Sequence, residues 1–460
     1  AATLNATIGA AVLVATQGGQ ACTGGPTTVT GCATVASPTS ATWGIDYSQQ
    51  TAARITFTDM VIDGTTNTKF TSAGFPVGKN FVGNIISVTS GTGFTVQRVA
   101  VVSTSGTTAT CDKSLGTLGS TGGNGKLGAA LASPGQSAAL TVNNNSVYVK
   151  SATYSITSAS VNIAGGTFAS TKSNLILEGY STVRGDLISA PILQASGIST
   201  ATLITMAVSG DWSVRNITVD GAGLTAISGI SPQRGFLYLV TAKNCTNYGF
   251  LSGNASLLVL CVATGCSGLP AFASTGPHIM CEAYSNTVTG FSGSANYIYC
   301  ISNGNSGATS DGFGIAPVLF NCAGCVSYGN GRDGFRSGAL CTLADCIAEG
   351  NTGIGFNGSG TATTLFNCAA FSNTGGDTSL ASALHLMNIG FITGTASFFT
   401  APGSRDFSLN NNAGGGALLL SAGIPGTFLS GTTVGYIDVG AAQSFAQMMT
   451  LLGLSGGMSG

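Results

Sequence analysis

Short apolar runs, separated by turns rich in glycine, serine and asparagine, recur along the second half of the chain. SLLVLCVA begins at Ser256, and NYIYCIS begins at Asn296. Runs of this length and composition are typical of β-strands. Strands this short cannot bury a face alone, so each is expected to hydrogen-bond to a neighbouring strand about 4.8 Å away.

These strands recur with a fixed period. An eleven-residue motif reads CVSYGNGRDGF from Cys325 and CIAEGNTGIGF from Cys346. Its first position recurs at steps of 19 to 25 residues, at Val240, Cys261, Cys281, Cys300, Cys325, Cys346 and Cys368. Its last position is aromatic, at Phe250, Phe272, Phe291, Phe313, Phe335 and Phe356. Such a period predicts a solenoid in which each repeat stacks on the one before it.

The motif also predicts which side chains line the interior. An inward cysteine acts as a small, soft apolar residue that stacks on its copy in the next coil. Asparagine tolerates left-handed backbone at a sharp corner, and its amide can bond the amide one coil along. We therefore expect two structural ladders, formed by Cys261, Cys281, Cys300, Cys325, Cys346 and Cys368 and by Asn286, Asn305, Asn330, Asn351 and Asn373.

The pattern of apolar and polar residues changes along the chain. Before residue 115 the period is absent, and apolar and polar residues alternate as in half-buried antiparallel strands, in ARITFTDMVID (53–63), NIISVTSG (84–91) and TVQRVAVV (95–102). The stretch GTLGSTGGNGKLGAALASPGQ is typical of a linker. The predicted segments are an N-terminal β-rich domain at 1–115, a Gly/Ser-rich linker at 116–136, a β-helix at 137–443 and an apolar C-terminal tail or cap at 444–460.

Composition narrows the class of protein. Of 460 residues, 69 are glycine and 7% are charged, and the net charge is −1. The charge is too low for a helical protein, and the abundance of Val, Ile, Leu and Phe excludes a disordered one. Near-neutral charge gives no indication of nucleic-acid binding. Polar residues interrupt every apolar run well short of the roughly 20 residues that span a bilayer, so no membrane span is expected.

The thirteen cysteines admit two interpretations, an extracellular disulfide framework or buried reduced thiols. Ten of them lie between Cys245 and Cys368, in the periodic region, which favours stacked thiols. A disulfide between Cys22 and Cys32 is a separate alternative. No metal or cofactor is expected, because His278 and His385 are the only histidines and paired CxxC sites do not occur.

Asp311 and Asp333 are the candidate catalytic residues. Both precede Gly-Phe in the repeat, which places them in register one coil apart, roughly 5 Å between backbones. Paired carboxylates near that separation suit a retaining glycosidase, and their repulsion would raise one pKa. The alternative, which we favour, is that each aspartate bonds backbone at its own turn. Arg332 adjoins Asp333, and the other acidic residues of the ladder region, Glu282, Asp345, Glu349 and Asp377, fall at unrelated repeat positions.

Three stretches carry a resemblance to a known family. VYVKSATYSIT near the start of the coils, the Cys/Asn ladder, and DFSL followed by YIDVGAAQ resemble right-handed parallel β-helix proteins of the pectin-lyase-like type. The resemblance covers about residues 140 to 443 and implies an all-β, single-stranded parallel β-helix. It does not specify a function, because that superfamily includes polysaccharide lyases, glycosidases, adhesins and phage appendages.

The order of a small β domain, a hinge, a β-helix and a short tail resembles tailspikes and related surface proteins of tailed phages. That resemblance implies a homotrimer on the virion surface that binds other virion proteins through its N-terminal domain. Host polysaccharide is a partner that the resemblance leaves open. The alternatives are a polysaccharide-degrading enzyme on the same scaffold, or a bacterial adhesin outside the cell or on its surface.

Overall fold

The computed structural model describes residues 5–8, 53–75, 84–128, 134–140 and, with short gaps, 146–420. The chain forms two compact units, residues 1–224 with 234–240 and residues 225–233 with 241–460. The alternative of a Cys22–Cys32 disulfide concerns residues outside the described part of the chain, where His385, YIDVGAAQ and the tail at 444–460 also lie.

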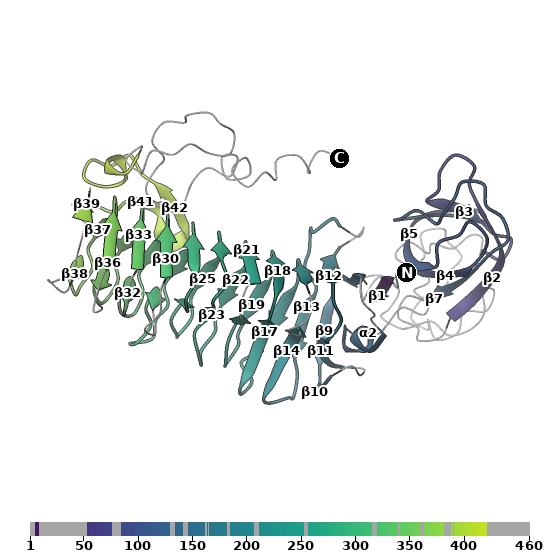
Figure 1. Cartoon of the computed structure of the whole chain (residues 1–460), viewed down its shortest axis with the longest axis horizontal. Helices are drawn as coiled ribbons and strands as arrows, with labels where there is room; N and C mark the ends of the chain where they lie inside the picture. Colours follow the sequence, from purple (N-terminus) through teal and green to yellow (C-terminus); the bar gives the residue numbers. More distant parts are fainter. Residues whose placement is uncertain are drawn as a thin grey trace, which may run out of the picture. The chain divides into compact units, whose positions relative to one another are not determined.

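An antiparallel barrel forms the N-terminal β domain (Figure 1). Its strands close in the order β2-β3-β6-β5-β4-β7. Phe57, Phe70 and Phe75 pack against one another in its core, with ring centroids 5.8 to 5.9 Å apart. The strand bounds are β2 (Ala53–Ile62), β3 (Lys69–Thr71), β4 (Ile85–Ser90), β5 (Gln97–Ser105), β6 (Thr108–Cys111) and β7 (Gly123–Gly128). The alternation along the sequence correctly predicts β2, β4 and β5.

The structure differs from the expected linker in the Gly-rich stretch. Residues 123–128 form β7, which pairs antiparallel with β2 and β4 and closes the barrel. The glycines of β7 allow close packing. A Cβ on Gly123 would meet the Phe94 ring, and a Cβ on Gly125 would lie 2.6 Å from Met60 Sδ. Residues Pro134–Leu140 then form helix α2.

The first coils follow in the same unit. Three parallel sheets each receive one strand per coil. The first contains β1 (Asn5–Ile8), β8 (Ser146–Lys150), β12 (Leu175–Tyr180), β15 (Trp212–Arg215) and β18 (Gly235–Tyr238). The second contains β9 (Thr153–Ile156), β13 (Ile192–Ala195) and β16 (Thr218–Asp220), and the third β10 (Ser158–Val161), β11 (Gly166–Ser170) and β14 (Ala201–Met206). Strand β1 joins the coils although the sequence assigns it to the N-terminal domain.

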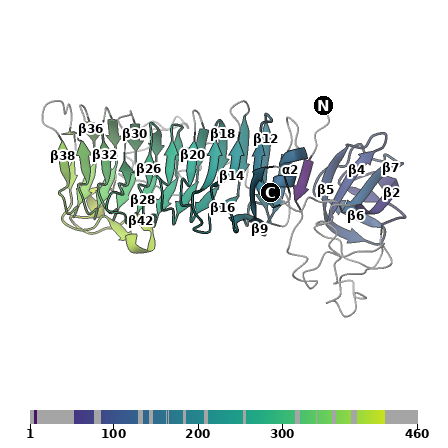
Figure 2. The same ribbon diagram turned by 90° about the horizontal axis from the view of Figure 1, so that it is seen from below.

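Within the second unit, strands of three parallel sheets form the regular repeat (Figure 2). The first sheet runs β21 (Ser256–Val259), β24 (His278–Ile279), β27 (Asn296–Ile298), β30 (Phe320–Ala323), β33 (Cys341–Ala344), β36 (Thr363–Phe366) and β39 (Asn388–Ile389). The second runs β19 (Thr241–Lys243), β22 (Val262–Thr264), β25 (Glu282–Tyr284), β28 (Ile301–Asn303), β31 (Val326–Tyr328), β34 (Ile347–Glu349), β37 (Ala369–Phe371) and β40 (Ile392–Thr393). The third runs β17 (Ile227–Pro232), β20 (Phe250–Ser252), β23 (Phe272–Ser274), β26 (Phe291–Ser292), β29 (Phe313–Gly314), β32 (Phe335–Ser337), β35 (Phe356–Gly358) and β38 (Thr378–Leu380).

The all-β parallel β-helix with a small N-terminal β domain is therefore confirmed. Its third sheet carries the motif phenylalanines on the inside. Phe250 and Phe272 lie 4.5 Å apart with an interplanar angle of 3°, and the following pairs stack in the same way as far as Phe356. Stacked rings at the coil spacing explain why the period of the sequence is so regular.

The described chain leaves the solenoid after β40. An antiparallel hairpin follows, formed by β41 (Phe399–Ala401), the 3-10 helix Pro402–Ser404 and β42 (Asp406–Leu409), and a second 3-10 helix spans Gly416–Leu418. Phe398, Phe399 and Phe407 pack on outward residues of the second sheet, including Val326 and Ile347. The predicted β-helix to residue 443 thus departs from the structure at this hairpin.

Candidate functional site

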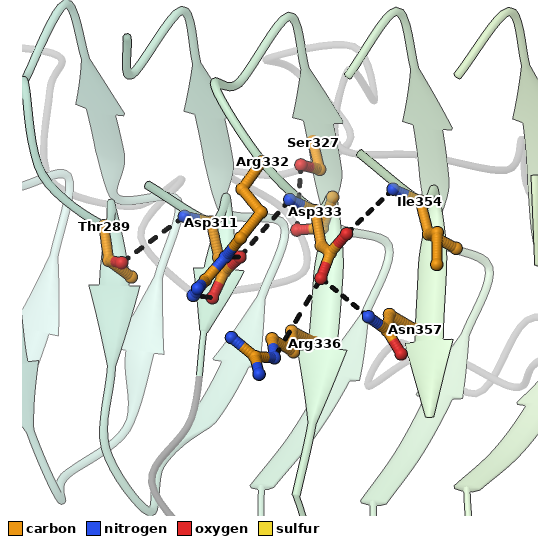
Figure 3. Close-up of polar contacts among 9 residues, drawn as sticks. Thr289, Asp311, Ser327, Arg332, Asp333, Arg336, Ile354 and Asn357 are labelled. Atoms are coloured by element: carbon orange, nitrogen blue, oxygen red, sulfur yellow. Dashed lines mark hydrogen bonds and ion pairs between the residues drawn. The ribbon is translucent and has the colours of Figure 1, made fainter. Parts of the chain in front are cut away.

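Asp311 sits in the turn before β29, and its carboxylate faces the next coil (Figure 3). Arg332 Nε donates to Asp311 Oδ1 at 2.6 Å, and Arg332 Nη2 donates to Asp311 Oδ2 at 2.5 Å. The backbone N–H of Asp333 also donates to Asp311 Oδ1, at 3.3 Å. Both oxygens of this carboxylate are therefore held by the neighbouring coil in a bidentate ion pair.

Asp333 repeats the arrangement one coil further on. The backbone N–H of Ile354 donates to Asp333 Oδ1 at 2.8 Å, and Asn357 Nδ2 donates to Oδ2 at 2.7 Å. Arg336 Nε lies 4.0 Å from Oδ2. Each aspartate thus ties its own turn to the turn of the following coil, as Figure 3 shows.

Burial decides what this pair can do chemically. Asp311 is 2% exposed and Asp333 is 5% exposed. Burial raises the pKa of Asp311, while its hydrogen bonds and charge attraction with Arg332 act in the opposite direction. A carboxylate that donates a proton or attacks a substrate must reach it, and these oxygens face other protein groups. The geometry of both aspartates is therefore that of a structural link between adjacent coils.

Two further acidic residues of the ladder region hold the C-terminal hairpin. Glu349 Oε1 accepts a hydrogen bond from Ser397 Oγ at 2.6 Å, and Glu349 Oε2 accepts one from the backbone N–H of Phe398 at 2.9 Å. Glu282 forms a bidentate ion pair with Arg405, whose guanidinium lies 3.7 Å from the centroid of the Tyr284 ring. These carboxylates lie apart from Asp311 and Asp333 in the repeat, so they do not complete an acid cluster with the pair.

The predicted asparagines form a continuous hydrogen-bonded ladder. Each Nδ2 donates to Oδ1 of the asparagine one coil on: Asn286 to Asn305 and Asn305 to Asn330 at 2.8 Å, Asn330 to Asn351 at 3.0 Å, and Asn351 to Asn373 at 2.9 Å. The same amide nitrogens donate to main-chain carbonyls of the preceding coil, for example Asn330 Nδ2 to Ser302 O at 3.2 Å. Asn373 ends the ladder by donating to Asp377 Oδ1 at 3.0 Å.

The predicted cysteines line the interior as reduced, buried thiols: Cys261, Cys281, Cys300, Cys325, Cys346 and Cys368. Each thiol donates to a carbonyl, as Cys281 Sγ does to Leu258 O at 3.5 Å. Burial raises the pKa of Cys281, Cys325 and Cys346 well above the ordinary value, which disfavours the reactive thiolate. Among the described residues, no group of three or more His, Cys, Asp or Glu side chains is arranged to hold a metal ion.

His278 is a buried residue whose environment the sequence does not reveal. It points into the solenoid from β24, where its ring lies 5.0 Å from the Tyr297 ring and 5.6 Å from the Phe272 ring. Burial lowers the pKa of His278 to about 4. The imidazole is therefore neutral at neutral pH and packs as an aromatic residue.

Sequence reasoning also missed a polar and aromatic surface on the outer face of the first sheet. Register pairs Glu178 with Arg215 and Arg215 with Tyr238, on three successive strands. Arg215 Nη1 lies 3.8 Å from Glu178 Oε2. Phe236 projects beside Tyr238, with ring centroids 6.0 Å apart and an interplanar angle of 13°. The only signal in the sequence is strand alternation, because these coils precede the regular motif.

Comparison with known proteins gives distant structural likenesses only. No family model matches the chain, and no curated protein matches it. A structural match is the A-module of the mannuronan C-5 epimerase AlgE4 from Azotobacter vinelandii, at 17% identity and a TM-score of 0.39, over 50% of this chain and 70% of that one. Pectate lyase Pel9A matches at 15% identity and a TM-score of 0.37, over 67% and 90%. ORF18 of Geobacillus virus E2 matches at 12% and 0.34, over 56% of this chain and 55% of its own.

These likenesses are too distant to transfer an activity. Nor do the described residues include a helix long and apolar enough to cross a membrane.

Proposed function

We propose that this chain is a structural protein of a tailed-phage virion, a homotrimeric β-helix appendage on the particle surface, with the N-terminal barrel as its attachment domain. The observation that carries the proposal is the state of Asp311 and Asp333. Their carboxylates are buried and held by Arg332, Asn357 and backbone N–H groups. The regular coils therefore serve as a scaffold.

A second observation supports lateral self-association. At the corner between the first and second sheets, one residue per coil has left-handed backbone. In later coils this position holds Gly324, Asp345 and Asn367, types that tolerate that conformation. In the earlier coils it holds Leu260 and Met280, with φ of 53° and 52°, and both remain partly exposed. Apolar residues in a strained, partly exposed position fit a surface that another subunit covers.

Another copy of the chain fits this corner better than an unrelated partner does. The apolar corners repeat at the coil spacing, and a second stack of coils has the same spacing. Rotation about an axis parallel to the stack brings each corner beside its equivalent, as a cyclic homo-oligomer requires. A trimer is the arrangement that the resemblance to tailspikes favours.

The second candidate function is a polysaccharide-degrading enzyme. It is favoured by Asp311, because burial shifts the pKa of this carboxyl upward, the direction that a general acid requires. Incubation with neutral and acidic polysaccharides, followed by assays for reducing ends and for unsaturated products, separates the two. The structural proposal predicts no product. A product that disappears in both Asp311→Asn and Asp333→Asn, with the fold retained, would establish the enzyme instead.

A further inference from the structure

The hairpin of β41 and β42 runs back along the second sheet, over coils that precede it in the sequence. Its start donates two hydrogen bonds to Glu349 of β34. Phe407 packs against Tyr328 of β31, with ring centroids 5.8 Å apart. The tip reaches β25, where Arg405 forms its bidentate ion pair with Glu282. Because β34, β31, β28 and β25 are successive strands of the sheet, the hairpin spans all four of them.

The hairpin also covers an apolar column on the outward side of this sheet. Register places Val262, Glu282, Ile301, Val326 and Ile347 in one column. Val262, which lies beyond the tip of the hairpin, is partly exposed, whereas Val326 and Ile347 are fully buried in the cluster that contains the hairpin phenylalanines. The hairpin is therefore docked by apolar packing along its length and by a carboxylate near each end.

This docking adds a contact that a solenoid ordinarily lacks. Each coil of a solenoid touches only the coils before and after it, so the last coil is held on one side and opens first. The ion pair between Glu282 and Arg405 instead joins residues 123 positions apart in the chain. Strand β40 of the last coil comes shortly before the hairpin in the sequence. That coil is thus tethered to the stack by its strand pairing and again by the docked hairpin.

We propose that the hairpin, residues 399–409, is a strap that locks the C-terminal coils against opening from the end of the solenoid. While the strap is docked at Glu282, the last coil cannot separate from the stack. When the strap lifts, the coils open from β40 inward, as in an ordinary solenoid. The strap is a conformational device of the scaffold, and it depends neither on the virion role nor on the trimer.

The test is hydrogen exchange of the intact protein, followed by mass spectrometry at the amides of β37. Arg405→Gln removes the ion pair at β25, four strands away from β37 in the sheet. We expect it to speed exchange in β37 by about threefold or more, because opening then requires less energy to lift the strap. Phe407→Ala removes part of the apolar cover and should speed this exchange by about tenfold or more.

Arg332→Gln is the matched control. It also removes a bidentate ion pair of a partly exposed guanidinium, but that pair links only neighbouring coils. Opening of the last coils leaves the pair between Arg332 and Asp311 intact, so exchange in β37 should stay at the wild-type rate.

Thermal melting of each variant first establishes that it is folded. A wild-type rate in β37 of Arg405→Gln would overturn the strap, because the end coils would then open beneath a docked hairpin. Equal acceleration in Arg405→Gln and Arg332→Gln would also overturn it, since β37 would then exchange only when the whole protein unfolds. If Phe407→Ala fails to fold, Arg405→Gln decides the matter, because its side chain is 41% exposed and its loss leaves no cavity.

Discussion

Asn351 Oδ1 accepts two hydrogen bonds from Asn330, one from the side-chain amide at 3.0 Å and one from the backbone N–H at 3.0 Å. The backbone N–H of Asn351 donates in turn to Asn373 Oδ1 at 3.1 Å. Each asparagine therefore joins three coils, since its Nδ2 also reaches a carbonyl of the coil before it. The corner is held by buried amides whose partners are other rungs of the same ladder.

Removal of one rung should lower stability without affecting ligand binding. Asn330→Ala and Asn351→Ala each leave neighbouring buried amides unpaired, so the free energy of unfolding should fall by about 1 to 3 kcal/mol. Asn321→Ala is the control, because Asn321 donates to Asn296 on the exposed surface and its loss should matter by less than about 0.5 kcal/mol. Unchanged melting temperatures for both ladder variants would contradict the structural role of these asparagines.

The cysteine ladder should be protected from alkylation. Cys261, Cys281, Cys300, Cys325, Cys346 and Cys368 are each at most 1% exposed, so reagent cannot reach them in the native protein. Mass spectrometry after iodoacetamide treatment should show these six thiols unmodified under native conditions and modified in guanidinium chloride. Rapid native modification of most of them would mean that the interior face is assigned wrongly.

His278 should make the protein less stable in acid. Its pKa is about 4 in the folded protein and about 6.5 when unfolded, so the unfolded chain takes up a proton first as the pH falls. The contribution of the neutral imidazole is complete above pH 6.5 and is lost between pH 6.5 and about 4, by about 3 kcal/mol.

The comparison protein for that measurement is His278→Phe, which keeps an aromatic ring among Phe272, Phe291 and Tyr297. Denaturant unfolding across this pH range should show a shallower loss of stability in the variant than in the wild type. Identical pH profiles would show that His278 does not titrate as its burial requires.

The sequence predicts the regular coils because their inward residues recur at fixed positions. Cys346, Asn351 and Phe356 each repeat one coil away, so one motif defines a whole turn of the solenoid. The sequence did not predict strand β7, because a glycine-rich stretch is typical both of a linker and of a strand that packs closely on large side chains. Here the glycines of β7 pack on Phe94 and Met60. The hairpin at β41 and β42 has no periodic signal.

The outer face of the first sheet shows a different limit of sequence reasoning. Glu178, Arg215 and Tyr238 are 37 and 23 residues apart, and only the register of β12, β15 and β18 brings them together. The strands before Val240 lack the motif that would align them by sequence. By contrast, the in-register placement of Asp311 and Asp333 follows from the motif, but their burial and their partners required the structure.

The apolar left-handed corner can be tested without harming the fold. Asparagine is more favourable than leucine in left-handed backbone, so Leu260→Asn should preserve or raise the melting temperature of the isolated chain while it weakens subunit association. Leu269→Asn is the control, because Leu269 is 41% exposed but its backbone is not left-handed. Equal oligomer dissociation curves for the two variants and the wild type, measured by dilution, would remove Leu260 from the interface.

The mass of the intact protein in solution tests the central claim most directly. One chain has a mass of 45.4 kDa. Light scattering coupled to gel filtration, at micromolar concentration, should give three times that mass with no concentration dependence. A stable monomer under these conditions would contradict the trimeric appendage and, with it, the structural virion role proposed for this chain.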